Sequence, residues 1–321
     1  MADLRTRYLG MALGSPLVAS SSPLTGTLDG LRRLEAAGAG AVVLPSLFEE
    51  DLAEAGPAAG AGPGGQARYG AGPGAYLSLV STARASLSIP VVASLNGVSR
   101  GGWASSASRL EEAGASALEL NIYYVSSRPG LSGSDVEWHY LDVVRAVRRA
   151  IGIPLAVKLS PYFSSTGEIA SRLDEAGADG LVLFNRFMQP DIDLETLATT
   201  AGIHLSSPAE ARLPRAWIAL LRGQVRASLA ATTGVEDADD VVKYLLAGAD
   251  VVMTTSALLR HGPEHARVLL DGLAAWMSRK GFTAVRDLRG LLRAPTHDQT
   301  TYERTGYLDA IQAAARRYGP G

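Results

Sequence analysis

The chain reads Glu175-Ala176-Gly177-Ala178-Asp179-Gly180-Leu181-Val182-Leu183 where a predicted helix gives way to a short apolar strand. Gly177 suits the left-handed backbone conformation that ends many helices, and the apolar run after it has the length of a buried strand. The same pattern recurs at 35–44, 112–120 and 247–253. This repeat predicts a chain that alternates helices with strands.

Apolar runs along the whole chain predict the strands Pro16–Ser21, Ala41–Ser46, Pro90–Leu95, Ala117–Asn121, Pro154–Leu159, Gly180–Asn185, Ser228–Gly234 and Asp250–Ser256. Eight strands separated by helices are the number that a closed parallel (β/α) barrel needs. The alternative, an open doubly wound sheet, would carry a glycine-rich dinucleotide turn after its first strand, where this chain has Ser20-Ser21-Ser22-Pro23. We therefore expect residues 1–321 to form a single (β/α)8 TIM barrel domain.

Three segments depart from the regular pattern. Residues 55–75 consist mostly of Gly, Pro and Ala, which predicts a mobile loop that is either a tolerated insertion or a lid over the site. Turn residues between Arg186 and Arg226 predict a short hairpin over the barrel mouth. Near the end of the chain, Glu264–Lys280 and Thr301–Tyr318 are predicted helices, and residues 264–318 are expected to close the fold.

The composition excludes several classes of function. The formal net charge is -2 and no run of basic residues occurs, so nucleic acid and acidic membranes are not expected partners. The chain has no cysteine, which excludes disulfides, thiolate zinc sites, cysteine-ligated iron–sulfur clusters and a cysteine nucleophile. The N-terminus contains Asp3 and precedes no long apolar segment, so we expect a cytoplasmic protein without a signal peptide or membrane anchor.

Polar residues and one glycine stand where the predicted strands end, which in a barrel is the face that carries the functional groups. They are Ser20, Ser21, Ser22, Ser46, Ser94, Asn96, Asn121, Lys158, Asn185, Thr232, Thr233, Gly234, Thr255 and Ser256. Apart from Lys158, the side chains are amides and hydroxyls, and no histidine is among them. This set favours a large polar ligand over a metal ion.

Lys158 is the charged residue of an otherwise apolar strand, Pro154–Leu159. It is either a strand-end lysine with a structural partner, a Schiff-base nucleophile, a phosphate clamp or the partner of an anionic cofactor. A Schiff-base lysine needs proton-transfer groups close by, whereas the neighbouring strand ends carry amides. The sequence therefore favours the cofactor role.

The last two strands each lead into a predicted helix through hydroxyl residues. Thr232-Thr233-Gly234 ends the seventh strand and Thr255-Ser256 ends the eighth. Barrels commonly bind phosphate at these two ends, because the first N–H groups of a helix have no partner within it. The alternative is that these Thr and Ser residues only cap their helices.

In order and spacing, these motifs resemble the flavin-binding framework of the soluble dihydroorotate dehydrogenases, from about Tyr8 to Gly281. The resemblance rests on Leu118–Asn121, Val157–Phe163, Asn185, Thr233–Val235 and Thr255–Leu258. It implies FMN as the cofactor, with Ser20, Ser21 and Ser22 near the ring, Asn121 and Lys158 beside the pyrimidine edge, Asn185 near the substrate, and Gly234, Thr255 and Ser256 on the phosphate. We also assign Ser94, Asn96 and Thr233 to the cofactor site, and Asn121 and Asn185 to substrate binding.

The chain departs from that family in the loop after the fourth strand. There the family carries a Cys or Ser that takes a proton from the substrate, whereas this chain has Tyr124 at the aligned position and Ser126 close behind. We expect Lys158 and either Tyr124 or Ser126 to be catalytic. Two further departures are Leu44-Pro45-Ser46, where the family has a lysine, and the 55–75 segment, where it has an asparagine-bearing substrate loop. We expect a divergent member.

The leading hypothesis is an FMN-dependent oxidoreductase that moves a hydride between the flavin and a small dihydropyrimidine-type substrate, with dihydroorotate as the first candidate. Its electron acceptor would be a soluble molecule or a redox partner protein, and we expect a homodimer. One alternative is a flavin-free lyase or aldolase that uses Lys158 as a Schiff-base nucleophile, and another is an FMN- or phosphate-binding barrel without turnover. Under the leading hypothesis, Lys158→Ala should lower flavin reduction far more than stability.

Overall fold

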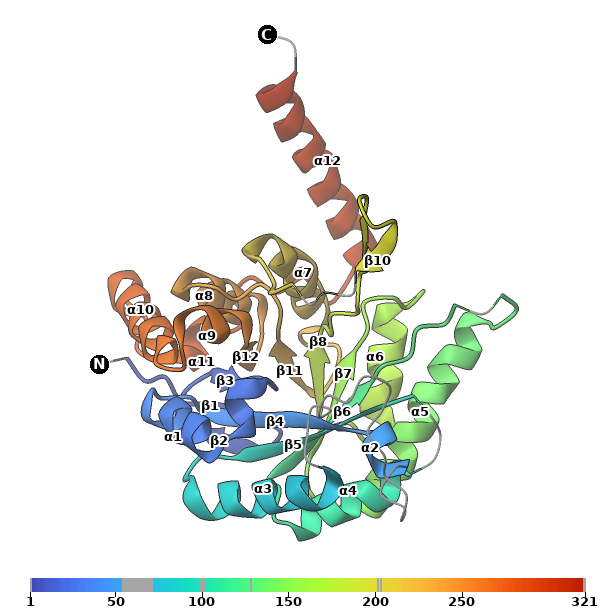
Figure 1. Cartoon of the computed structure of the whole chain (residues 1–321). Helices are drawn as coiled ribbons and strands as arrows, with labels where there is room; N and C mark the ends of the chain where they lie inside the picture. Colours follow the sequence, from blue (N-terminus) through green and yellow to red (C-terminus); the bar gives the residue numbers. More distant parts are fainter. Residues whose placement is uncertain are drawn as a thin grey trace.

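The computed structural model of the protein describes residues 2–53, 72–98, 102–127, 129–200, 202 and 204–319. Its centre is a closed barrel of parallel strands in the order β11-β12-β3-β4-β5-β6-β7-β8 (Figure 1). The barrel strands are β3 (Leu17–Ala19), β4 (Ala41–Phe48), β5 (Val91–Gly97), β6 (Ala117–Ile122), β7 (Leu155–Leu159), β8 (Gly180–Leu183), β11 (Ser228–Ala231) and β12 (Val251–Thr254). The predicted (β/α)8 TIM barrel is confirmed, and each barrel strand overlaps a stretch that the apolar pattern indicated.

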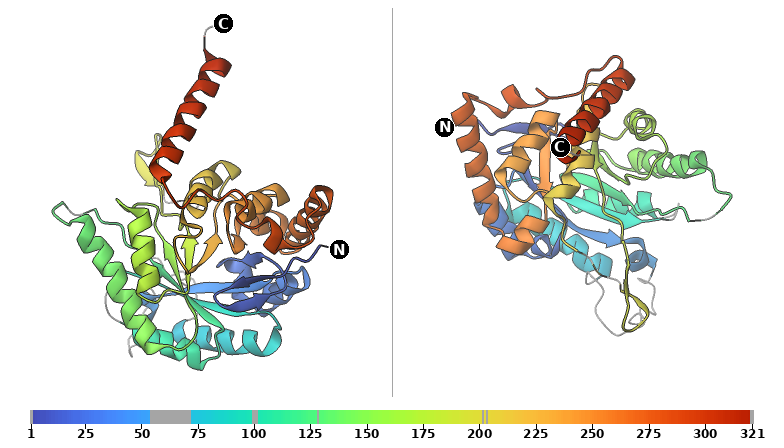
Figure 2. Two further views of the ribbon diagram at one scale, coloured as in Figure 1. Left: turned by 180° about the vertical axis from the view of Figure 1, so that it is seen from behind. Right: turned by 90° about the horizontal axis from the view of Figure 1, so that it is seen from above.

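Most of the helices surround the barrel and cover the outer faces of its strands (Figures 1 and 2). The helices are α1 (Leu28–Ala36), α2 (Glu49–Ala53), α3 (Gly72–Ser86), α4 (Trp103–Glu112), α5 (Gly133–Ala150), α6 (Thr166–Glu175), α7 (Arg212–Leu221), α8 (Ala238–Ala247), α9 (Ser256–His261), α10 (His265–Lys280), α11 (Val285–Leu288) and α12 (Gln299–Tyr318), with 3-10 turns η1 (Pro23–Gly26) and η2 (Pro208–Ala211). Helix residues such as Leu34, Val147 and Leu245 are buried in one apolar cluster with the strand residues Val42 and Leu118. This cluster is the outer core between the helices and the barrel.

The inward-facing strand residues form a separate core inside the barrel. Because successive side chains of a strand point to opposite faces, Ala117 belongs to the inner cluster and Leu118 to the outer one. The inner cluster also contains Tyr8 and Leu9, from the antiparallel hairpin of β1 (Thr6–Tyr8) and β2 (Met11–Leu13). A side chain at Gly180 would come within 2.4 Å of Leu9, which places the hairpin at the first residue of β8. The hairpin therefore closes the barrel at the end where the strands begin, and the functional groups lie at the other end.

The irregular middle of the chain contains a hairpin and a helix. β9 (Asp191–Asp193) pairs with β10 (Ala198–Thr200) in antiparallel fashion, which confirms the hairpin predicted between Arg186 and Arg226. The same stretch contains α7, which the turn signals did not indicate. Most of the loop predicted at 55–75 lies outside the described residues, and its last residues, 72–75, begin α3.

The two predicted C-terminal helices correspond to α10 and α12. α10 packs onto the barrel layer through buried side chains that include Leu269, Leu273 and Met277. α12 has no buried residue and projects away from the barrel (Figures 1 and 2). Its first residue is tied down, because Gln299 Nε2 donates a hydrogen bond to Leu220 O at 3.0 Å, but the rest of the helix leads outward. α10 therefore packs onto the barrel and α12 leads away from it, and the closing role expected for residues 264–318 stays a prediction.

Carboxylates near the ends of helices tie the barrel together at the end where the strands begin. Each of these helices follows one barrel strand. Its carboxylate accepts hydrogen bonds from the backbone amides that precede the second barrel strand after that one. These ties join Glu35 with Ser88 and Ile89, Glu111 with Gly152 and Ile153, and Asp174 with Arg226 and Ala227. The repeated βα units are thus linked through charge-assisted hydrogen bonds as well as through apolar packing.

Glu35→Gln tests these ties through the pH dependence of stability. Burial alone would raise the pKa of the Glu35 carboxyl, but the hydrogen bonds from Ser88 and Ile89 outweigh burial and hold the pKa below its ordinary value. The folded protein therefore binds this proton less readily than the unfolded chain. The stabilisation is present above the unfolded-state pKa and is lost as the pH falls through the folded-state pKa.

We expect Glu35→Gln to lower the free energy of unfolding by about 1 kcal/mol at pH 7, because solvent screens this partly exposed group, and by almost nothing at a pH well below the folded-state pKa. Urea denaturation at the two pH values measures the difference. Glu112→Gln, at an exposed position of the next repeat, is the matched control. An equal loss of stability at both pH values would contradict the assignment.

Candidate functional site

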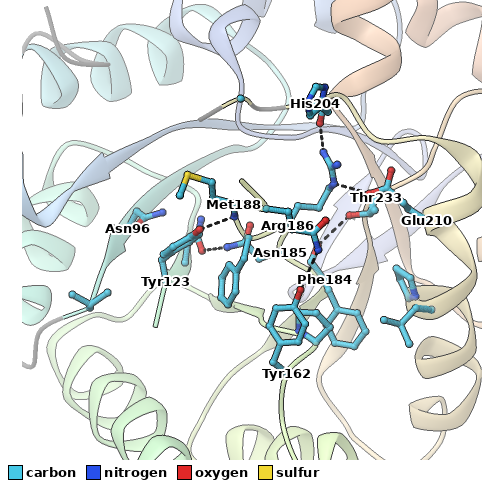
Figure 3. Close-up of a pocket in the computed structure, with 18 of the residues that line it drawn as sticks. Asn96, Tyr123, Tyr162, Phe184, Asn185, Arg186, Met188, His204, Glu210 and Thr233 are labelled. Carbon is cyan, nitrogen blue, oxygen red and sulfur yellow. Dashed lines mark hydrogen bonds and ion pairs between the residues drawn. The ribbon is translucent and has the colours of Figure 1, made fainter. Parts of the chain in front are cut away.

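A cavity of about 850 Å³ opens at the end of the barrel where β5, β6, β8 and β11 finish (Figure 3). Its volume lies within the ~300–1,000 Å³ that pockets for cofactors and small ligands occupy. The lining residues that matter most here are Asn96, Asn121, Tyr123, Asn185, Arg186 and Thr233. Four of the residues predicted from the sequence, Asn96, Asn121, Asn185 and Thr233, thus lie around one cavity.

Two of the predicted carboxamides contact each other directly. Asn185 Nδ2 donates a hydrogen bond to Asn121 Oδ1 at 2.8 Å. Asn121 is on β6 and Asn185 follows β8, so β7 lies between them, and its residue Lys158 pairs in register with Asn121. The three residues therefore occupy three neighbouring strand ends. Together they offer hydrogen-bond donors and acceptors of the kind that the polar edge of a planar heterocycle requires.

Glu119 is a charged residue of the site that the sequence reasoning missed. Lys158 Nζ lies 3.4 Å from Glu119 Oε1, and their side chains are 11% and 1% exposed. Glu119 Oε2 is buried without a hydrogen-bond partner in the described part of the chain. Burial, followed by the negative charge of Glu119, raises the pKa of Tyr8 beneath it. Period-two alternation could have indicated Glu119, because it precedes Asn121 by two residues and so shares its inward face.

Three buried tyrosines from the helices hold the strand ends below the cavity. Tyr140 of α5 donates to Ile122 O at 2.9 Å, and Tyr244 of α8 donates to Thr233 O at 2.7 Å. Tyr76 of α3 accepts a hydrogen bond from Ser94 N at 2.9 Å. Burial raises the pKa of all three phenols well above the ordinary value, so they stay neutral. The strand ends are therefore fixed through their backbone, which leaves the inward side chains free for a ligand.

Several predicted hydroxyl residues lie beside the cavity without lining its described wall. Ser94 is fully buried, and its Oγ lies 2.9 Å from Ser46 Oγ. Ser20, Ser21 and Ser22 follow β3 at its junction with β12, where Ser20 N donates to the Thr254 carbonyl at 3.0 Å. Thr255 Oγ1 also reaches this junction and donates to Ser21 O at 3.4 Å.

Two of the three predicted phosphate ligands, Gly234 and Ser256, meet around Ser206, a residue of the irregular stretch between Arg186 and Arg226. Gly234 N donates to Ser206 Oγ at 3.1 Å, and the hydroxyls of Ser206 and Ser256 lie 3.0 Å apart. Gly234 has φ +73, and a side chain there would come within 2.8 Å of Ser207 O. The approach of the 206–211 segment therefore requires glycine at position 234.

Arg186 crosses the mouth of the cavity and holds this same segment (Figure 3). Its Nε donates to Glu210 Oε1 at 2.9 Å, and its Nη1 donates to the His204 carbonyl. The other carboxylate oxygen of Glu210 accepts from Ser207 N at 2.7 Å, at the start of η2. Sequence reasoning did not single out Arg186 or Glu210, because neither lies on a strand.

Tyr124 and Ser126 lie away from the cavity in this structure. The Tyr124 ring packs against His139 of α5, with ring centroids 5.0 Å apart, and Ser126 is exposed. Within the described residues, neither belongs to the cavity wall, whereas the neighbouring Tyr123 does. The structure therefore brings Lys158 close to Asn121 and Asn185 but does not bring Tyr124 or Ser126 to them.

No three His, Cys, Asp or Glu side chains of the described ranges come together in a way that would hold a metal ion. No helix described there combines the length and apolar character that crossing a membrane requires.

The Lys158–Glu119 pair changes what Lys158→Ala should do to stability. The substitution leaves the Glu119 carboxylate buried without a counter-charge, and breaking such a pair costs about 3–5 kcal/mol. We therefore expect a large loss of stability, in contrast to the small loss expected from the sequence. The double variant Lys158→Met/Glu119→Gln removes both charges, and its free energy of unfolding should lie within about 2 kcal/mol of the unsubstituted protein. Urea denaturation compares the variants, and equal stability of the single and double variants would show that the pair is not coupled.

Comparison with known proteins shows which family the chain resembles. Residues 70–277 match the sequence profile of the family described as Dihydroorotate dehydrogenase. The chain is 35% identical over 212 residues to a provisionally named dihydroorotate dehydrogenase A (fumarate) of Aeropyrum pernix, covering 63% of this chain and 67% of that protein. It is 33% identical over 211 residues to the catalytic subunit of dihydroorotate dehydrogenase B (NAD(+)) of Methanothermobacter thermautotrophicus, covering 63% and 69%. It is 31% identical over 207 residues to dihydroorotate dehydrogenase A (fumarate) of Limosilactobacillus reuteri, covering 62% and 67%.

The profile match takes in the strands β5 to β12, with Asn121, Lys158, Asn185 and the 206–256 region. These are the elements that build the cavity and the loops around it. Because of this profile match and of the identity to the relatives named above, the chain belongs to the dihydroorotate dehydrogenase family.

Proposed function

We propose that the protein is an FMN-dependent oxidoreductase that transfers a hydride between the flavin and a CH–CH bond of a dihydropyrimidine-type substrate, with dihydroorotate as the first candidate. Family membership supports the reaction class, and the relatives reported above carry dihydroorotate in their names. The observation that carries the proposal is the group of Asn121, Lys158 and Asn185 on neighbouring strand ends. Asn121 and Asn185 line the cavity, and Lys158 stands on the strand between them without being part of the described wall.

The residues present fit a flavin. Asn96, Asn121 and Asn185 supply both amide donors and carbonyl acceptors, which the pyrimidine edge of the ring requires. An ammonium has three N–H donors, so Lys158 can keep its bond to Glu119 and still donate to a ligand. Phe184 and Phe187 add flat apolar surface to the cavity wall.

FMN supplies the two-electron acceptor when it is bound. Lys158 would hold a positive charge toward the bound flavin and so stabilise negative charge on it, and the Glu119 carboxylate holds the ammonium in position. Asn121 and Asn185, which hydrogen-bond each other, would orient the flavin through their remaining donors and acceptors. We also assign these two amides to substrate binding.

We assign the phosphate to the end where Gly234, Thr255 and Ser256 stand. Gly234 N donates to Ser206 Oγ, and Ser206 Oγ donates to Ser256 Oγ. A phosphate oxygen would accept from the Gly234 N–H and from the hydroxyls of these two serines. Arg260 Nη2 donates to Ser206 O at 2.8 Å, which brings a positive charge near this group. Thr233, which directly precedes Gly234, is part of the cavity wall.

The electron acceptor is assigned to a soluble molecule or a partner protein. The relatives carry either fumarate or NAD(+) in their names. The present chain has no cysteine with which to hold an iron–sulfur relay of its own. The homodimer stays a prediction that oligomer analysis in solution will check.

The Schiff-base alternative is disfavoured by the ion pair, because Glu119 engages the Nζ atom that such a mechanism needs free. The colour of the purified protein distinguishes a flavoprotein from a flavin-free aldolase. A protein that is yellow and releases FMN excludes the flavin-free aldolase, whereas borohydride trapping of a substrate on Lys158 would favour it. Anaerobic mixing of the flavin-loaded protein with dihydroorotate and related dihydropyrimidines should bleach the flavin. An FMN-loaded protein that none of these bleaches is a binding barrel instead.

Asn121→Ala should weaken FMN binding by about tenfold, because the loss of one hydrogen bond to the ring edge corresponds to about 1.4 kcal/mol. The dissociation constant of FMN, measured by quenching of flavin fluorescence, checks this. Gln312→Ala on α12 is the control, since this residue lies on the exposed C-terminal helix and should leave the constant unchanged. Full flavin affinity in the Asn121 variant would show that this amide does not hold the ring.

A further inference from the structure

We propose that Tyr123 is the residue that exchanges a proton with the substrate. The inference rests on the proposed function, in which a hydride and a proton leave adjacent carbons and the proton needs a group in the cavity wall. Of the residues that follow β6, Tyr123 lines the cavity, whereas Tyr124 and Ser126 do not. Tyr123 is two residues beyond Asn121, so it stands next to the group that orients the ligand.

The hydroxyl of Tyr123 has a defined partner. Met188 N donates a hydrogen bond to Tyr123 Oη at 2.8 Å (Figure 3). The phenol oxygen is the acceptor in this bond. The hydroxyl proton of Tyr123 is therefore not engaged by Met188 and can be donated to a ligand. An N–H group that donates to the oxygen also stabilises the ionised phenol that remains after the proton has left.

The ring of Tyr123 is held in place by aromatic neighbours. Its centroid lies 4.3 Å from that of Phe187, and Phe187 in turn lies 5.7 Å from Tyr162. Such contacts restrict the rotamers of all three rings. A proton-transfer group needs this kind of fixed position, because its oxygen must stay within hydrogen-bond reach of the proton on the reacting carbon.

The other ionisable side chains of the cavity are less well placed. Glu210 is engaged by Arg186 Nε at 2.9 Å and by Ser207 N at 2.7 Å. Tyr162 is 63% exposed and stands at the rim. Glu50 and His204 are exposed as well, and Glu50 is the rival that the experiment includes.

In the oxidative direction, the C–H bond beside the carbon that gives up its hydride would break, and its proton would go to the ionised oxygen of Tyr123. The electron pair of that C–H bond would form the C=C bond, and the two electrons of the hydride would go to the bound FMN, which is the oxidant of the proposed function. In the reverse direction the neutral phenol gives its proton to the carbon beside the one that receives the hydride.

The test compares Tyr123→Phe with Tyr124→Phe in the FMN-loaded protein. Phenylalanine keeps the ring contact with Phe187 at position 123 and the ring contact with His139 at position 124, so we expect unchanged FMN affinity and unchanged unfolding free energy in both variants. Anaerobic flavin bleaching by dihydroorotate should slow at least ~100-fold in Tyr123→Phe and by less than about threefold in Tyr124→Phe.

Each other outcome decides against Tyr123. If the unsubstituted protein bleaches and Tyr123→Phe bleaches equally fast, the inference fails while the proposed function stands. A variant that loses FMN but reacts normally per bound flavin has lost a structural group. A comparable loss in Glu50→Gln or Tyr124→Phe, with Tyr123→Phe active, assigns the proton to that residue. If no dihydropyrimidine bleaches the unsubstituted protein, the proposed function and the inference fall together.

Discussion

The buried ion pair between Glu119 and Lys158 lies at the level where the barrel interior changes from apolar to polar. Beneath it the inward residues include Ala117 and Ala156, and above it Asn121 begins the polar mouth. A carboxylate that is 1% exposed requires a compensating charge, because an isolated charge at such a depth is strongly disfavoured. The positive charge that a ligand in the mouth would meet is therefore also part of what keeps the barrel folded.

The two ends of the barrel are stabilised by different means. Where the strands begin, helix-end carboxylates such as Glu35 and Glu111 bind backbone amides, and the β1–β2 hairpin fills the opening. Where the strands finish, the phenols of Tyr140 and Tyr244 bind backbone carbonyls from the helix side. Because these tyrosines approach from outside, the inward side chains at the same level remain available, which is the arrangement that a binding site on a barrel needs.

The strand-borne half of the site could be predicted from the sequence, and the loop-borne half could not. Asn121 and Lys158 follow from the end points of apolar runs, and Glu119 follows from period two once Asn121 is placed. Ser206 and Tyr123 lie in segments without periodicity, and contacts with Ser256 and Met188 position them. In such a segment a shift of one residue decides which side chain faces the cavity, which is why the aligned residue Tyr124 and the lining residue Tyr123 differ. The outward course of α12 was likewise not visible in its sequence. Among the contacts described for the first turn of this helix, the hydrogen bond of Gln299 attaches it to the barrel.

The expected departures from the family lie both in loops and on one barrel strand. The residues assigned to the flavin edge lie on β6 and β7 and just after β8, where the barrel geometry fixes them. Of the departures, one lies in the loop after β6 and one in the stretch from 55 to 75, whereas Leu44-Pro45-Ser46 belongs to the barrel strand β4. Among the described residues that line the cavity, Tyr123, Phe187 and Tyr162 form an aromatic part of the wall, beside polar side chains such as Arg186 and Glu210. A wall of rings presents flat faces and few hydrogen-bonding groups, so it selects for the shape of a planar substrate more than for its polar pattern. The amides at the strand ends and the rings beyond them therefore give the cavity two chemically different parts, one suited to the polar edge of a heterocycle and the other to its flat face.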